Sequence, residues 1–277
     1  MSRAATISLA FTKMSAAGND FLVIDARDNE MSLADADARR LADRAHPITG
    51  GCDQLLLIRP ARDTGDCFME IRNADGGEAE ACGNGVRAVA AYLNRQNGAE
   101  NCNIETLGGL VRCTIEAENI TADFPVPTIG FALAQPVDDK SAVMLDEALP
   151  PACLVGLGNP HAIIFVESDG AALTARYGAA LTTHPIFPAD ANIGFAEMTA
   201  PDALKLTSWE RGVGITKACG TNACAAAVAA VHRGLAESGT LHIEQSGGTL
   251  KVFYDRTDGM LRQSGPALFH EEGVAEL

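Results

Sequence analysis

The segment ACGTNACAAAVAAV occupies residues 218–231, and residues 223–231 within it consist only of Ala, Val and Cys. A helix without a polar face is buried on every side, so this run predicts a helix at the centre of a lobe. The segment ACGNGVRAVAA at residues 81–91 has the same Ala-Cys-Gly start, 219 − 82 = 137 residues earlier. The sequence therefore predicts two equivalent turns, each leading into an apolar helix.

Two further pairs of segments repeat at almost the same offset. Gly18-Asn19 and Gly158-Asn159 each precede an apolar run, and 159 − 19 = 140. Residues 103–109 match residues 242–248, and 243 − 104 = 139. One short match would be chance, but three matches in the same order indicate two homologous halves.

Many short strand patterns and few helical patterns predict an α+β protein. The strand patterns include 53–58, 110–115, 162–166 and 249–254, and the helical patterns are 33–45, 85–96 and 223–233. Gly98 and Gly234 can end two of these helices in the left-handed conformation. Pro125 and Pro127 favour an extended connector between the halves. We expect two lobes, residues 1–127 and 128–263, with a C-terminal strand at about 264–277 completing the first.

The composition limits the partners that the protein can have. The 277 residues include 21 Lys+Arg and 36 Asp+Glu, so the formal charge is −15. Phosphate backbones and anionic membranes need clustered Lys and Arg, so we expect neither nucleic acid nor a membrane as partner. A small anionic substrate stays possible, because a site can be locally positive in an acidic protein. The longest apolar run, residues 223–231, is far shorter than a membrane span of about 20 residues.

Eight cysteines are spread along the chain without a Cys-x-x-Cys pair, which leaves zinc-ribbon and thioredoxin-type sites without support. Residues Met1 to Phe11 contain no sustained apolar core of a signal peptide. We therefore expect free thiols in a reducing cytoplasm, most of them packed as small hydrophobic side chains.

Cys82 and Cys219 are the exceptions, because each precedes a predicted apolar helix. Unpaired N–H groups and the helix dipole at such a position lower the pKa of a thiol and bind anions. We expect Asn84 or Thr221 to act as N-cap. If the two lobes face each other, one thiolate can remove the α-proton of an amino acid while the opposite thiol delivers another. Without the duplication, either cysteine would more simply be a packing residue.

At these residues the chain resembles the diaminopimelate epimerase family, a group of PLP-independent amino-acid racemases and epimerases. The resemblance covers almost the whole chain. It rests on the motifs at 13–14, 18–21, 53–56, 72–76, 78–80, 82–87, 158–161, 210–214 and 218–221. It implies two pseudo-symmetric lobes, each a mixed, barrel-like sheet around a central helix. It also implies a homodimer that needs no cofactor and no metal.

The resemblance further implies Cys82 and Cys219 as the catalytic acid/base pair, with His161 and Glu210 tuning the thiols. The residues that it implies for substrate binding are Asn19, Gln54, Asn73, Gly83, Asn84, Asn159, Asn192, Glu210, Arg211, Gly220 and Thr221. Diaminopimelate has a second amino-acid head at its far end. Arg211 can bind its carboxylate, and carbonyl or carboxylate oxygens can accept its ammonium protons.

Several positions depart from the usual family pattern, and none has an assigned chemical role. They are Ser15 and Ala16 in the first motif, Gly77 and Ala81 near Cys82, Ile215 and Asn222 near Cys219, and Glu271, where a Tyr of the dimer contact is common. Asn tolerates capping geometry, so Asn222 is expected to be a mild change. The others allow an altered substrate preference or dimer geometry.

Two other functions remain open at this point. A related racemase of another amino acid would share every catalytic feature, and only Asn73, Asn192 and Arg211 argue against it. A non-catalytic thiol redox or ligand-binding protein could also place two cysteines face to face, since low-pKa thiols oxidise readily.

Overall fold

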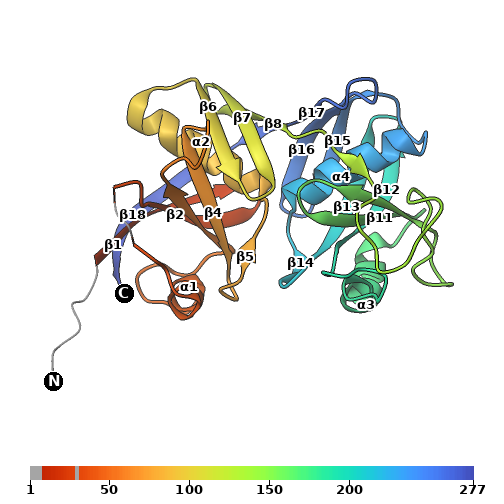
Figure 1. The fold of residues 1–277 in the computed structure, drawn as a ribbon, viewed down its shortest axis with the longest axis horizontal. Coiled ribbons are helices and arrows are strands. Elements are labelled where there is room, and N and C mark those ends of the chain that lie inside the picture. The colour runs from red at the N-terminus through yellow and green to blue at the C-terminus, as the bar shows by residue number, and fades with distance from the viewer. Residues whose placement is uncertain (1–7, 29–30) are drawn as a thin grey trace.

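The computed structural model describes residues 8–28 and 31–277, and it shows two lobes of similar build side by side (Figure 1). The expectation about a signal peptide at Met1 to Phe11 falls largely on residues 1–7, which lie outside the described residues. In the part of the chain that is described, no helix is long and apolar enough to cross a membrane.

The two halves contain the same succession of elements. The first half consists of β1 (Ser8–Ala16), β2 (Asn19–Asp25), α1 (Asp35–Ala42), β3 (Gln54–Arg59), β4 (Cys67–Asn73), β5 (Glu78–Ala79), α2 (Gly83–Asn97), β6 (Asn101–Thr106), β7 (Gly109–Glu116), β8 (Asn119–Phe124) and β9 (Thr128–Ile129). The second half consists of β10 (Ala152–Gly156), β11 (Pro160–Phe165), α3 (Gly170–Thr182), β12 (Asn192–Ala200), β13 (Ala203–Glu210), β14 (Gly214–Thr216), α4 (Gly220–His232), β15 (Gly239–Gln245), β16 (Gly248–Tyr254), β17 (Leu261–Pro266) and β18 (Leu268–Glu276).

Strand pairing repeats in the same way. The β1–β2 and β10–β11 pairs are antiparallel, and the β2–β3 and β11–β12 pairs that follow are parallel. The next pairs, β3–β4 and β12–β13, are antiparallel, and the steps β4–β6 and β13–β15 are again parallel. Each lobe is therefore a mixed sheet with the same order of strands, which confirms the α+β fold of two pseudo-symmetric lobes.

Each half lends its last strand to the other lobe. Strand β9 is the last strand of the first half but pairs with β10, whereas β18, the last strand of the second half, pairs with β1. In Figure 1 the blue C-terminal strand lies beside the red N-terminal strand. Strands β8 and β17 pair with each other and join the two sheets. This exchange ties the lobes together by backbone hydrogen bonds.

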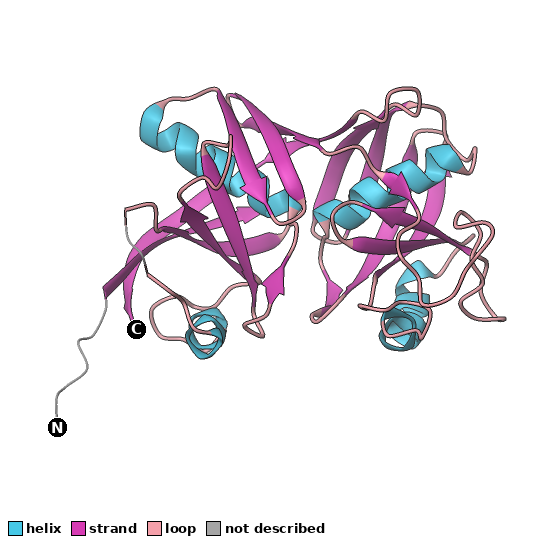
Figure 2. Cartoon of the chain, in the orientation of Figure 1, coloured by secondary structure: helices cyan, strands magenta, loops and turns pink. Residues whose placement is uncertain are grey.

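A helix lies inside each curved sheet, as predicted from the two apolar segments (Figure 2). Every residue of α4 from Gly220 to Val231 is buried, and most of α2 is buried as well. Both helices begin where the lobes meet, so their N-termini are brought into the same region. Gly98 ends α2 at φ = 72°, in the left-handed conformation that was expected.

Helix α3 was not predicted from its own residues. Its sequence is rich in Ala, Gly and Thr and lacks a clear apolar stripe. It packs on β12 and β13, and a Cβ at Gly178 would lie 2.6 Å from the Trp209 ring. The repeat itself contains the missing signal, because α3 occupies the place in the second half that α1 occupies in the first.

The lobes touch at two symmetry-related pairs of glycines. A Cβ on Gly18 would lie 2.6 Å from Gly247 Cα, and a Cβ on Gly158 would lie 2.6 Å from Gly108 Cα. Gly18 and Gly158 have φ values of 84° and 81°, where side chains are also disfavoured. Both pairs bring turns of opposite lobes into backbone contact.

We expect Gly158→Ala to lower the free energy of unfolding by about 2–4 kcal/mol, because it adds a lobe–lobe clash to the backbone strain. Gly234→Ala is the matched control. Gly234 has a similar φ of 71°, but a Cβ added there would have no atom of the described residues within 4 Å. That control should cost about 1 kcal/mol. Urea denaturation of both variants checks this, and equal losses would mean that the lobe contact contributes nothing.

Candidate active site

A cleft of about 290 Å³ lies where the two central helices begin, and both Cys82 and Cys219 line it. Most of the residues predicted for the site also line it. They are Asn19, Gln54, Asn73, Gly83, Asn159, Asn192, Glu210, Arg211, Gly220 and Thr221. The side chains of Asn84 and His161 lie behind the cleft and are fully buried.

The two cysteines are themselves the N-caps of the central helices. The Sγ of Cys82 accepts the Gly85 N–H at 3.2 Å, and the Sγ of Cys219 accepts the Asn222 N–H at 3.4 Å. The expectation that Asn84 or Thr221 would be the N-cap is therefore wrong. An N-cap side chain bonds the N–H of the third helical residue, and the thiols stand at the position from which that is possible.

The first turns of the two helices present four N–H groups to the cleft region. The N–H groups of Gly83, Asn84, Gly220 and Thr221 have no backbone acceptor among residues 8–28 and 31–277, as expected at a helix start. A Cβ on Gly220 would lie 2.9 Å from Asn84 Oδ1, so glycine permits the two starts to meet. Two positive helix ends thus converge on one small volume, which suits a carboxylate.

Burial controls the charge state of both thiols. It raises the pKa of Cys82 to about 12, and the Glu210 carboxylate adds to this, although the Gly85 N–H and Arg87 act in the opposite direction. It raises the pKa of Cys219 well above the ordinary value, and the nearby Glu210 carboxylate adds to this. The expectation that the helix ends lower the pKa values of the two thiols below the ordinary value is therefore wrong. The helix ends favour the thiolate, but desolvation outweighs them.

Glu210 stands next to Cys219 at the end of β13. Its carboxylate accepts the Thr216 hydroxyl at 2.5 Å, and the Cys219 thiol lies close to it. Burial raises the pKa of Glu210, while the Thr216 hydroxyl and the Cys219 thiol oppose the rise. A carboxylate close to a thiol, with its pKa shifted towards neutrality, is suited to exchange a proton with it.

His161 holds amides in place. Its Nε2 lies 2.8 Å from Asn159 Oδ1 and its Nδ1 lies 3.1 Å from Asn222 Oδ1. Burial lowers the pKa of His161 to about 4, and the charge of Arg211 contributes in the same direction. The imidazole is therefore neutral at physiological pH. A neutral imidazole carries one N–H, so it donates to one of these two amide oxygens. Asn159 lines the cleft, and the backbone N–H of Asn222 bonds Cys219.

This neutral histidine predicts an acid-sensitive contribution to stability. The pKa of His161 is about 4 in the folded chain against 6.5 for an ordinary histidine, so the unfolded chain binds the extra proton between these values. Stability is then lost as the pH falls below 6.5. From pH 7 to pH 5 the free energy of unfolding should fall by about 2 kcal/mol more in the wild type than in His161→Gln. Denaturant titrations at both pH values measure this difference, and identical pH dependence would contradict a buried neutral ring.

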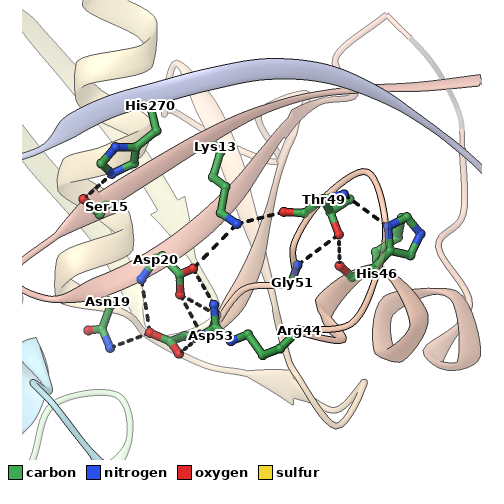
Figure 3. Close-up of polar contacts among 11 residues, drawn as sticks. Lys13, Ser15, Asn19, Asp20, Arg44, His46, Thr49, Gly51, Asp53 and His270 are labelled. Carbon is green, nitrogen blue, oxygen red and sulfur yellow. Dashed lines mark hydrogen bonds and ion pairs between the residues drawn. The ribbon is translucent and has the colours of Figure 1, made fainter.

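A second polar network, of which Asn19, Asp20, Arg44 and Asp53 are drawn in Figure 3, fixes the opposite wall of the cleft. Asn84 Nδ2 donates to Asn19 Oδ1 at 2.7 Å, and Asn19 Nδ2 donates to Asp53 Oδ2 at 3.3 Å. Asp53 and Asp20 each accept the other's backbone N–H, and Arg44 binds both carboxylates. The amide of Asn19 is therefore held by partners on both sides.

The far part of the cleft contains amides and one arginine. Gln54 Nε2 donates to Asn73 Oδ1 at 2.9 Å, and Asn192 Oδ1 accepts the Arg211 backbone N–H at 2.9 Å. The guanidinium of Arg211 bonds the Ala189 carbonyl and, at 2.5 Å, the carboxylate of Glu80 from the other lobe. Both charged side chains line the cleft, so this ion pair crosses it.

Comparison with known proteins agrees with this geometry. The family model described as diaminopimelate epimerase matches residues 11–126 and again 153–269, one stretch in each half. The chain belongs to the diaminopimelate epimerase family. The diaminopimelate epimerase of Acidiphilium cryptum is 42% identical over 268 residues, covering 95% of each chain. That of Erythrobacter litoralis is 41% identical and covers 94% of each.

The fold has a wider distribution than this family. A probable proline racemase from Agrobacterium radiobacter matches with a TM-score of 0.70 at 16% identity, covering 96% of this chain and 92% of that one. At this identity the likeness concerns the fold alone. The chain is thus a member of the diaminopimelate epimerase family, and its fold also occurs in that probable proline racemase.

The structure shows the surroundings of three residues that depart from the usual family pattern. Asn222 is more than a mild change, because its side chain bonds His161, the Ile193 carbonyl and the Ser208 hydroxyl. Ser15 bonds His270 at 2.7 Å (Figure 3), and neither residue lines the cleft. Ile215 is exposed on β14. The network around Asn222 would lose these bonds if glycine stood there.

Four carboxylates that line the cleft were not predicted as site residues from the sequence. Asp53, Asp75, Glu78 and Glu80 line the cleft together with Glu210, against the single guanidinium of Arg211. All four lie within the motifs at 53–56, 72–76 and 78–80 that carry the resemblance, but no role in the site was predicted for them. A cleft with this excess of acid suits a ligand that carries ammonium groups.

Proposed function

We propose that this protein interconverts LL- and meso-2,6-diaminopimelate, in the biosynthesis of lysine and peptidoglycan. The observation that carries the proposal is the pair of cysteines that cap two converging helices across one cleft, in a chain of the diaminopimelate epimerase family. A cleft lined by acidic groups, amides and one arginine accommodates both amino-acid heads of such a substrate.

The reacting head would place its α-carboxylate on the N–H groups of Gly83, Asn84, Gly220 and Thr221. Its α-carbon would then lie between the two sulfurs. When the α-proton leaves, negative charge spreads onto the carboxylate, so donors already in place stabilise the transition state more than the ground state. The α-ammonium adds a positive charge beside the thiols, and this charge favours the thiolate that the step needs.

In the chemical step, the thiolate of one cysteine takes the α-proton and the C–H electron pair stays on the substrate as a carbanion. The thiol of the other cysteine then gives its proton to the opposite face and becomes the thiolate. The centre is inverted, and the total charge of the site is unchanged. Each cysteine acts as base in one direction. The step assigns no role to PLP or to a metal ion.

The far head would bind at the other end of the cleft. The guanidinium of Arg211 would donate hydrogen bonds to its carboxylate, and the oxygens of Asn73, Asn159, Asn192 and the nearby carboxylates can accept its ammonium protons. Neutral His161 would help to hold the amide of Asn159. Glu210 would exchange protons with Cys219. A racemase of an amino acid with one head would have no use for this far set.

Deuterium exchange tests the proposal directly. The reduced protein should incorporate deuterium at the α-carbon of LL-diaminopimelate in heavy water, and NMR would show loss of the α-proton signal as the meso form appears. The same measurement with proline and other amino acids with one head is the control. No exchange with diaminopimelate in the presence of reductant would reject the proposal, and exchange of another amino acid instead would favour a related racemase.

We also propose that the protein works in the cytoplasm as a homodimer. Free thiols at all eight cysteines agree with a reducing compartment. Leu268 and Val274 on β18 are exposed hydrophobic side chains, as expected if this strand contributes to a contact between subunits. Sedimentation at micromolar concentration would separate a dimer from a monomer.

A further inference from the structure

Arg87 is a cation inside the N-terminal lobe. It is fully buried, and it is the only Lys or Arg among the buried residues of 8–28 and 31–277. No carboxylate of these residues forms an ion pair with it, and its Nε has no hydrogen-bond partner there. A buried charge without a counter-ion is costly to the fold. A negative charge that binds or forms nearby during turnover would offset that cost.

The two hydrogen bonds of Arg87 connect the active site with the strand that joins the lobes. Nη2 donates to Asn84 Oδ1 at 2.5 Å, and Nη1 donates to the Pro266 carbonyl at 3.2 Å. A Cβ at Gly265 would overlap Nη1, so β17 leaves room for the guanidinium. Because Asn84 Oδ1 faces Arg87, its Nδ2 faces Asn19, which lines the cleft.

The second lobe has a neutral residue at the equivalent position. The position that matches Arg87 at the repeat offset is 87 + 137 = 224, a buried cysteine. The group that holds Asn159 there is neutral His161, whereas Asn19 is held through Asn84 by charged Arg87. The Glu210 carboxylate raises the pKa of both thiols, whereas Arg87 opposes this rise at Cys82 and does not act on Cys219. The two thiols therefore stand in different electrostatic surroundings.

We propose that Arg87 is a positioning residue, whose buried charge fixes the amide of Asn84 and supplies on the Cys82 side of the cleft the positive potential that the Cys219 side lacks. The proposal rests on the proposed function for its use in turnover. Burial lowers the pKa of Arg87 to about 10, so it is still protonated at neutral pH, and the titratable groups that act on it are the thiols of Cys82, Cys113 and Cys224. The charged groups that act on Cys82 are Glu210, which raises the pKa of the thiol, and Arg87, which lowers it.

Alkylation of the thiols tests the charge without any substrate. Iodoacetamide reacts with thiolate, so its rate at pH 8 follows the thiolate fraction. In Arg87→Met we expect the rate at Cys82, read by mass spectrometry of its peptide, to fall about tenfold. The rate at Cys219 in the same digest should change less than about twofold. Arg87→Lys keeps the charge and should keep the rate at Cys82.

The folding control is Leu93→Ala, which removes a buried side chain from the same helix without changing charge. It should lower the unfolding midpoint but leave both alkylation rates unchanged. If Arg87→Met does not fold, Arg87→Gln, which keeps an amide towards Asn84 without charge, replaces it. An unchanged rate at Cys82 in the neutral variant, or an equal fall at both thiols, would overturn the proposal.

Turnover supplies a second readout. With diaminopimelate, Arg87→Met should shift the acid limb of the kcat/KM profile to higher pH by about one unit, and Arg87→Lys should restore it. Absence of exchange in the wild type would reject the proposed function alone, because the alkylation result would stand by itself. A normal pH profile in Arg87→Met would reject the positioning role alone.

Discussion

Replacing either cleft sulfur with oxygen, as Cys82→Ser or Cys219→Ser, should lower the rate of epimerisation by about 10³-fold or more. A serine hydroxyl is far less acidic than a thiol, so it neither takes the α-proton as an anion nor returns it readily. Each cysteine serves one face of the α-carbon, and loss of one therefore stops inversion in both directions. The loss should appear in kcat, with a smaller change in KM, because the carboxylate donors are backbone groups that the substitution leaves in place.

The same substitutions should leave the fold intact. Both sulfurs accept the N–H of the third helical residue, at 3.2 and 3.4 Å, and serine is one of the preferred N-cap residues. Circular dichroism and the unfolding midpoint should therefore stay close to the wild type. Cys153→Ala is the matched control, since Cys153 is a buried thiol on β10 away from the cleft. It should retain turnover, and inversion by either serine variant within tenfold of the wild type would refute the two-thiol mechanism.

The duplicated turns made the site predictable, because a repeat carries information that single residues lack. Cys219, Asn159 and Arg211 are individually ambiguous, yet their counterparts or neighbouring motifs place them around one cleft. The charge state of the thiols was not predictable, because desolvation depends on how completely the lobes cover them. The sequence shows the helix start that favours the thiolate but contains no measure of that burial.

The contacts between the two halves could not be predicted from the sequence either. The pair Glu80–Arg211 joins residues 131 positions apart, and the exchange of β9 and β18 joins each half to the opposite sheet. Helix α3 was missed because its own residues lack an apolar stripe, although α1 marks its place in the repeat. Local patterns predicted both central helices, α1 and several strands, while the contacts that close the cleft arise from the packing of one lobe on the other.

Loss of the far-end cation is the second large effect that we expect. Arg211→Met should lower kcat/KM for diaminopimelate by about 100-fold, because the far carboxylate would lose its charged hydrogen bonds and face a cleft lined by carboxylates. The loss should appear mostly in KM. Arg233→Met is the control, since that exposed guanidinium bonds the Pro151 carbonyl in the same lobe and should leave both constants unchanged. A normal KM in Arg211→Met would place the far carboxylate elsewhere.

The ion pair with Glu80 determines how easily the guanidinium of Arg211 becomes available to the substrate. Glu80 pairs with the guanidinium that the substrate carboxylate needs, and the side chains of Glu80 and Arg211 are 37% and 25% exposed. A pair that is partly exposed is held by about 1 kcal/mol, so a substrate can displace it. Glu80→Gln removes the competing charge and should lower KM by up to about fivefold at unchanged kcat. A rise in KM would instead mean that Glu80 itself binds the far ammonium, and the two variants together therefore assign both charges of the far head.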